Sequence, residues 1–144
     1  MADEHRRIPE SKRAKFTGRG KDHSFLQLRH DLLRSSQFHQ LSGNAVKLLL
    51  FLAAQFNGRN NGDLSMAKVD LVKAGWASEA TARRARKELL EADFIRITRH
   101  GACRRCYLFA VTWLPVDECI GKDIEVASER TACDWWKSKR EGHK

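Results

Sequence analysis

Motifs that support catalysis are missing from this sequence. It contains no nucleophile motif, no glycine-rich phosphate-binding loop and no cluster of acidic and basic side chains at a catalytic spacing. Three of the histidines, His23, His30 and His39, have no recognisable catalytic neighbours, so each is better explained as a surface or capping residue. We therefore expect a protein that is not an enzyme and that uses no cofactor.

Long hydrophobic runs are also absent. The most hydrophobic stretch, residues 41–56, is too short and too interrupted to cross a bilayer. The charges near the N-terminus are not followed by the apolar core of a secretory signal. These absences predict a cytoplasmic protein, which we expect to be bacterial, without membrane contact.

Cysteines are few and poorly spaced for metal binding. Cys103 and Cys106 form a CxxC, whereas Cys119 and Cys133 are isolated and no second CxxC or HxxxH pair exists. A structural zinc ion needs four ligands held tetrahedrally, and one CxxC supplies only two of them. We favour reduced cysteines without metal, because disulfides are rare inside cells. The alternative is a zinc site made by Cys103, Cys106, Cys119 and either His100 or Cys133.

Positive charge, by contrast, is abundant. Lysine and arginine number 27 against 18 acidic residues, which gives a net charge of +9 and a pI near 9.8. This balance favours a polyanionic partner, although acidic protein surfaces and anionic membranes also attract such a chain. Cations are concentrated in residues 6–21, where Glu10 is the one acidic residue. We expect residues 1–23 to be a disordered basic arm, which either follows DNA phosphates or serves as a solubilising tail.

The spacing of apolar residues predicts a long first helix over residues 41–56. Ser42 is its expected N-cap, and apolar residues recur at steps of three and four, as on one face of a helix. The residues expected on that buried face are Val46, Leu49, Leu50, Ala53 and Phe56. Turn-forming residues 57–62 follow, and Asp63-Leu64 can form a brief strand.

Residues 65–75 predict a short helix and a glycine turn. Ser65 can cap a helix over residues 66–74, because its hydroxyl can accept from an unpaired amide of the first turn. The apolar residues expected to share one face of this helix are Val69, Leu71 and Val72. Gly75 supplies the left-handed residue that ends the helix.

A second helix, over residues 79–92, carries most of the functional signal. Ser78 is its candidate N-cap. A helical wheel places Ala82, Ala85 and Leu89 on the buried side, with Arg86 and Leu90 flanking them. The outward side is small near its start and cationic in its middle, with Ala80, Thr81, Arg83, Arg84, Lys87 and Glu91. Such a face suits entry into a DNA major groove; the alternative is a solvated surface helix whose cations pair with Glu79, Glu88 and Glu91.

Two strand-like runs follow this helix. Residues 94–99 alternate apolar and polar side chains, and residues 107–113 are rich in β-forming types. The loop between them contains glycine and is basic, so we expect Arg99, Arg104 and Arg105 near its tip, where cations can reach phosphates or a minor groove. The whole pattern predicts an α+β, mainly α fold: a winged helix-turn-helix of three helices and a β-hairpin wing.

Pro115 closes the predicted domain, and residues 115–144 form a short C-terminal extension. Its first part, residues 116–127, is expected to be irregular, whereas residues 129–140 can form a short helix that carries Trp135 and Trp136. Paired tryptophans near a terminus either pack back on the domain or bind a partner. We favour packing back; the alternative is that a second copy of the chain or another protein binds there.

Four segments carry a resemblance to a known family: FHQLS at 38–42, NNGDLS at 60–65, TARRARKEL at 81–89, and Phe94-Ile95. Across residues 24–114 the chain resembles the winged-helix DNA-binding proteins of phages, plasmids and integrated elements, and is similar to the N-terminal domains of phage and plasmid replication initiators. The resemblance implies duplex-DNA binding. Nothing after Trp113 is long enough for a helicase-loading or nicking domain, so we expect DNA recognition alone.

Residues and resemblance together predict a duplex-DNA-binding protein of a mobile genetic element, acting as a transcriptional regulator or a replication-initiation factor. The expected DNA-binding residues are Ser78, Thr81, Arg83, Arg84, Lys87, Arg99, Arg104 and Arg105. A function of another class is an adaptor or inhibitor that uses the same basic face to bind an acidic protein. A third is a metal- or redox-responsive regulator that acts through Cys103 and Cys106.

Overall fold

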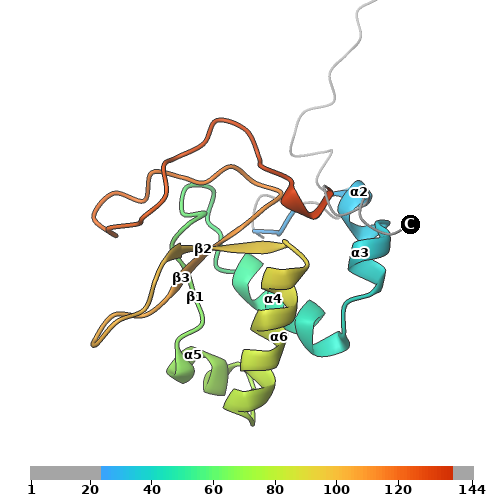
Figure 1. Cartoon of the computed structure of the whole chain (residues 1–144), viewed down its shortest axis with the longest axis horizontal. Coiled ribbons are helices and arrows are strands. Elements are labelled where there is room, and N and C mark those ends of the chain that lie inside the picture. The colour runs from blue at the N-terminus through green and yellow to red at the C-terminus, as the bar shows by residue number, and fades with distance from the viewer. Residues whose placement is uncertain (1–23, 138–144) are drawn as a thin grey trace, which may run out of the picture.

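A computed structural model describes residues 24–137 of the chain; the predicted basic arm, residues 1–23, lies outside this range. The described part is an α+β domain with two main helices and a three-stranded antiparallel sheet of order β1-β3-β2 (Figure 1). The elements are α2 (His30–Leu33), α3 (Ser36–His39), α4 (Gly43–Ala53), β1 (Leu64–Ser65), α5 (Lys68–Lys73), α6 (Glu79–Glu91), β2 (Ile95–Arg99) and β3 (Leu108–Val111).

Helix α4 begins where the sequence predicts but turns a different face to the core. The hydroxyl of Ser42 accepts from the amide of Ala45, which confirms the cap. The buried residues are Ala45, Leu48, Leu49, Leu52 and Ala53, so only two of the five predicted core positions are right. Leu50, which we placed in the core, is 41% exposed. Residues 48–52 are all apolar, so periodicity alone cannot choose the face that packs against α6.

Helix α5 differs from the prediction at its start and in its buried face. Ser65 does not cap it, because Ser65 lies in β1, where its amide and carbonyl both bond to the side chain of Gln55 at 3.0 and 2.9 Å. The helix begins at Lys68 without a side-chain cap. Of the three predicted apolar residues, only Leu71 is buried; Val69 and Val72 are 64% and 60% exposed. Gly75 has the predicted left-handed conformation, with φ of +84°.

Helix α6 agrees with the prediction. The Ser78 hydroxyl accepts from the amide of Thr81 at 3.3 Å, and Ala82, Ala85 and Leu89 are buried. Two alanines on this side let α6 approach α4 closely, and the two helices lie together against one face of the sheet (Figure 1).

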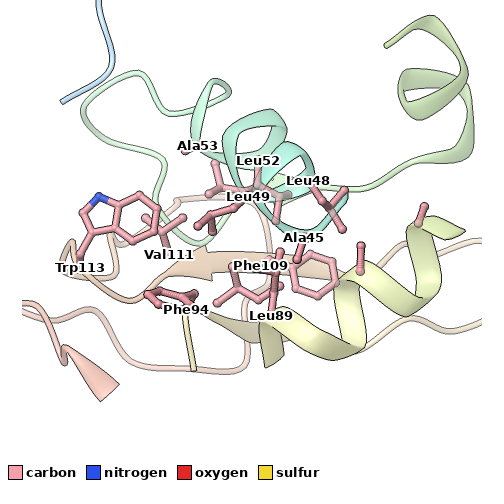
Figure 2. Packing of buried hydrophobic residues seen from close by; sticks show 14 of the residues in the cluster. Ala45, Leu48, Leu49, Leu52, Ala53, Leu89, Phe94, Phe109, Val111 and Trp113 are labelled. Atoms are coloured by element: carbon pink, nitrogen blue, oxygen red, sulfur yellow. The ribbon is translucent and has the colours of Figure 1, made fainter. Parts of the chain in front are cut away.

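The hydrophobic core lies between these two helices and the sheet. Figure 2 shows side chains from α4, including Leu48, Leu49 and Leu52, above Phe109 of β3 and Leu89 of α6. Phe94, at the start of the hairpin, extends this core toward the C-terminal end of the chain: its ring is edge-on to Phe38 and stacked on Trp136, with centroids 6.2 and 6.1 Å away.

The predicted hairpin is present, and its strands pair with one irregularity. Ile97 pairs with Phe109 but Arg99 pairs with Leu108, so Thr98 is an extra residue on β2, a β-bulge. Thr98 is fully buried, and its hydroxyl donates to the carbonyl of Gly62 at 2.6 Å. Because Thr98 has no partner residue on β3, its backbone carbonyl is available to a segment outside the sheet. The amide of Glu125 donates to this carbonyl at 2.7 Å.

That segment is residues 115–137, which we call the strap (orange to red in Figure 1). It runs across the sheet, with backbone bonds from Asp117 to Asn61 and from Asp134 to Thr112 in addition to the one at Thr98. Residues 108–111 of β3 are all buried, because the helices cover one face and the strap covers the other. On the strap side Arg96, the cross-strand partner of Ala110, contacts Glu129 and Trp135.

The strap is irregular over residues 116–127, as expected, but the helix predicted over residues 129–140 is wrong in its described part. Only a single 3₁₀ turn forms, at residues 135–137; residues 138–140 lie outside the described range. Asp134 has φ of +46°, which is incompatible with a continuous helix, and its amide is taken by the carbonyl of Thr112. Of the two tryptophans that we expected to pack back on the domain, Trp136 does so and is 3% exposed, whereas Trp135 is 42% exposed. None of the helices in residues 24–137 is long and apolar enough to cross a membrane.

Candidate nucleic-acid interface

The outward face of α6 carries the cations that the sequence predicts there. Arg83 and Lys87 have side chains that are 66% and 77% exposed. Each pairs with a carboxylate four residues away on the same helix: Arg83 Nη2 lies 3.3 Å from Glu79 Oε1, and Lys87 Nζ lies 3.8 Å from Glu91 Oε1. Exposed pairs of this kind contribute only about 0.3 to 0.5 kcal/mol, so another anion can readily replace the carboxylate.

Arg84, Thr81 and Ser78 complete the predicted set on α6. Arg84 is exposed, and its side chain forms no ion pair or hydrogen bond with any other residue in the range 24–137. Thr81 is half-buried, and the Ser78 hydroxyl already accepts from its amide. The helix thus presents small side chains at its start and long donors one turn later, which is the arrangement predicted from the sequence.

The third acidic residue of α6 is not part of this face. Glu88 instead reaches the start of α4, where its two carboxylate oxygens accept from the amide and the hydroxyl of Ser42 at 2.6 and 2.7 Å. Of the three ion pairs expected in the alternative of a solvated surface helix, that of Glu88 is therefore absent, whereas those of Glu79 and Glu91 are present. The middle of the outward face consequently has cations in excess.

Two residues that sequence reasoning left outside the site connect α6 to the hairpin. The guanidinium carbon of Arg86 lies 5.4 Å from the ring centroid of Tyr107, a cation–π contact. The ring of Tyr107 packs closely over Gly101, where an added Cβ would lie 2.6 Å from two ring carbons. Arg86 also lines a groove of about 350 Å³ between α5 and α6, together with Trp76 and Leu71. The only signal for Arg86 in the sequence was its predicted position beside the buried residues Ala82, Ala85 and Leu89 of the same helix.

The tip of the hairpin, residues 99–107, is a tight turn. Ala102 and Arg105 exchange two backbone hydrogen bonds of 2.9 and 3.0 Å, and Arg104 between them has φ of +62°. Arg104 is exposed and has no ion pair or hydrogen bond within the described range, so this predicted site residue projects from the turn unpaired.

The other two predicted cations of the tip are directed toward the strap. Arg99 donates to the carbonyl of Lys122 at 2.9 Å and to that of Cys106 at 3.1 Å. Arg105 lies 3.4 Å from Asp123 and 3.2 Å from Glu125. The structure therefore brings Arg99 and Arg105 together with an acidic segment and not with the exposed cations of α6.

Glu125 is the centre of this contact. Its Oε2 lies 2.7 Å from Nδ1 of His100, and Oε1 lies 3.2 Å from Arg105. The hydrogen bond from His100 is the main cause that lowers the pKa of Glu125; the nearby charge of Arg105 adds to it, while partial burial acts in the opposite direction. Glu125 is thus held as a carboxylate beside the side chains of His100 and Arg105.

The cysteines do not assemble the zinc site considered from the sequence. Within residues 24–137 no group of three or more His, Cys, Asp or Glu side chains has a geometry that could hold a metal ion. Cys103 and Cys106 are exposed thiols at the tip, while Cys119 and Cys133 are half-buried elsewhere on the strap. Burial is the main cause that raises the pKa of Cys119.

Comparisons with known proteins identify no relative of this chain. No family model matches the chain, and neither a similar curated protein nor a similar solved structure was found. The case for a function therefore depends on the side chains described above.

Proposed function

We propose that this chain is a duplex-DNA-binding protein of the winged-helix type, in which α6 enters the major groove. Support comes from the order helix, strand, helix, helix, strand, strand formed by α4, β1, α5, α6, β2 and β3, with the sheet order β1-β3-β2. The resemblance noted in the sequence places such a protein in a phage, plasmid or integrated element, as a transcriptional regulator or replication-initiation factor.

The observation that carries this proposal is the outward face of α6. Arg83, Arg84 and Lys87 project from it, and among residues 24–137 the only carboxylates that pair with any of them belong to the same helix. A helix about 10 to 12 Å across fits a major groove about 12 Å wide. Arg84 is the best candidate for a base contact, because a guanidinium can donate two hydrogen bonds to guanine and this one has no competing partner in the described range.

An adaptor that binds an acidic protein is the second candidate, and one observation favours it. Arg105 and His100 already bind carboxylates in this molecule, those of Asp123 and Glu125. The tip is therefore chemically suited to carboxylates as well as to phosphates. An acidic protein that bound these tip side chains would have to replace Asp123 and Glu125.

Selection of bound duplexes from a random pool tests the proposal. The wild type should enrich a shared sequence motif, and Arg84→Ala with Lys87→Ala should abolish it. The matched control is Arg34→Ala with Arg59→Ala, which removes the same charge from exposed positions outside α6 and the hairpin. Enrichment of no motif by the wild type, or equal loss in both variants, would contradict the proposal and favour the adaptor.

Salt dependence provides an independent check. If about six to ten phosphates are neutralised, affinity should fall by roughly 10³ to 10⁵ between 50 and 200 mM salt. A nearly flat response would show that phosphate contacts do not drive binding.

A further inference from the structure

We propose that the strap is an autoinhibitory cover on the hairpin tip: Asp123 and Glu125 occupy the cations that DNA phosphates would otherwise bind, so DNA must displace this part of the strap. The inference rests on the proposed DNA-binding function and adds to it a built-in competitor. It applies to the tip and leaves the face of α6 open.

The contacts are those expected of a phosphate substitute. Carboxylate oxygens of Asp123 and Glu125 lie 3.4 and 3.2 Å from Arg105, and Glu125 also lies 2.7 Å from His100. The carbonyl of Lys122 accepts from Arg99 at 2.9 Å. Three donor side chains of the tip thus bind acceptors from three residues within the stretch 122–125 of the strap, as a run of backbone phosphates would bind them.

These contacts can be exchanged without unfolding the domain. The side chains of Asp123 and His100 are 88% and 67% exposed, and ion pairs at such positions contribute little net stability. The strap is fixed on either side of this stretch, by Val116 and Trp136, which are 1% and 3% exposed. Residues 118–127 can therefore lift from the tip while both ends stay anchored.

One unsatisfied group shows that the cover is imperfect. Nε of Arg105 is buried without a hydrogen-bond partner, although the other nitrogens of this guanidinium are paired. A buried donor left unpaired opposes the closed arrangement. A phosphate, with oxygens available to several nitrogens of the same guanidinium, competes on favourable terms.

The decisive experiment compares Glu125→Gln with Glu118→Gln. Both remove one negative charge from the strap, but Glu118 is exposed and forms no ion pair or hydrogen bond with the residues in the described range. With the duplex selected from the random pool, we expect Glu125→Gln to bind about two- to fivefold more tightly than Glu118→Gln, because the cover is weakened. In an Arg105→Ala background this difference should become smaller, since one of the two tip side chains that Glu125 contacts is already removed and only His100 remains.

Hydrogen exchange gives a second measurement that needs no variant. The amide of Glu125 donates to the carbonyl of Thr98, so its exchange should become faster when saturating duplex lifts the strap, while amides of α6 become slower. Unchanged or slower exchange at residues 122–126 would overturn the inference.

The outcomes separate the two proposals. If the loss of Arg84 and Lys87 abolishes binding but Glu125→Gln equals Glu118→Gln, the cover is disproved and DNA binding stands. If the wild type binds no duplex and the strap variants change nothing, both proposals fail. Thermal melts of both glutamine variants verify folding, and a misfolded variant leaves the exchange experiment on the wild type to decide.

Discussion

The face of α6 and the tip of the hairpin both carry arginines, but they hold them in different ways. Arg83 and Lys87 pair with residues four positions away on one helix, whereas Arg105 and Arg99 bind acceptors 20 and 23 positions away, on the strap. Helical spacing dictates the first kind of pair, and only the tertiary path of the chain produces the second. A basic residue in a sequence therefore shows charge, not availability.

The path of the strap can be traced to a few buried groups. The bulge at Thr98 provides a carbonyl for Glu125 in the middle of the strap. Asn61, which is fully buried, fixes the start of the strap: its side-chain amide donates to the carbonyls of Pro115 and of Leu114, the residue before the strap, at 2.9 and 3.1 Å. The availability of the tip cations is thus decided by buried groups outside the tip, at Thr98 and Asn61.

Removing the side chain of Asn61 should release the start of the strap, and we expect it to have the largest effect on stability of the changes considered. In addition to the strap, Asn61 bonds to both backbone groups of Val111, at 2.9 and 3.0 Å. Asn61→Ala leaves these groups buried without partners, so we expect the free energy of unfolding to fall by roughly 2 to 4 kcal/mol. Urea denaturation measures it. Asn44→Ala, at an exposed position of α4, is the control, and equal midpoints would contradict the role given to Asn61.

Single arginine substitutions should have the next largest effect, and they distinguish the role of α6 in DNA binding from that of the hairpin tip. Arg84 and Arg104 are both exposed and both without an ion pair in the described range, but one lies on α6 and the other on the tip. Arg84→Ala should cost about 1 to 3 kcal/mol of binding and relax preference at one base position, whereas Arg104→Ala should weaken all sequences alike and lower the salt slope by about one. Binding titrations on matched and mismatched duplexes at two salt concentrations distinguish the two variants. Identical profiles would contradict the proposal that Arg84 contacts bases and Arg104 contacts phosphates.

Much of the α6 side of the molecule could be predicted because its determinants are local. The cap at Ser78, the turn at Gly75 and the alanine and leucine stripe lie within a few residues of what they control. Local reasoning gave the wrong buried face for α4, because a continuous apolar run fits more than one face. It also gave the wrong role for Ser65, whose backbone groups bond to the side chain of Gln55. Local propensity cannot foresee such competition.

The strap side could not be predicted for the opposite reason. The segments around Glu125 and Glu129 lack periodicity, and their positions depend on single acceptors such as Thr98 and on the ion pair of Arg96 with Glu129. Trp136 was recognised as a residue to be buried, but the helix expected around it was not formed. The burial of a large aromatic side chain can be inferred from its residue type, whereas the backbone conformation that places it in the core cannot.

Glu88 forms a link between α6 and the start of α4. Its carboxylate accepts from the amide and hydroxyl of Ser42, the residue that caps α4. Glu88→Gln should lower the free energy of unfolding by about 0.5 to 1 kcal/mol, because charge-assisted bonds at an exposed site become neutral or are lost. The control is Glu91→Gln, which removes only a surface pair with Lys87 and should have a smaller effect. Thermal melts of both variants decide, and an equal shift would contradict the link.

The smallest effect concerns the far end of the strap, where Arg29 and Lys137 surround Asp31. A hydrogen bond from Arg29 is the main cause that lowers the pKa of Asp31 from 3.8 to about 2; burial opposes the shift, and a bond from Lys137 adds to it. Because the folded-state pKa is the lower one, the stabilisation is complete above pH 3.8 and is lost as pH falls toward about 2. Asp31→Asn should therefore be less stable than the wild type at neutral pH, with the difference shrinking across this window. Urea denaturation along a pH series measures the difference, and Asp70→Asn, an exposed change of equal charge on α5, is the control. A difference that keeps its full size down to pH 2 would show that Asp31 acts through packing and not through its charge.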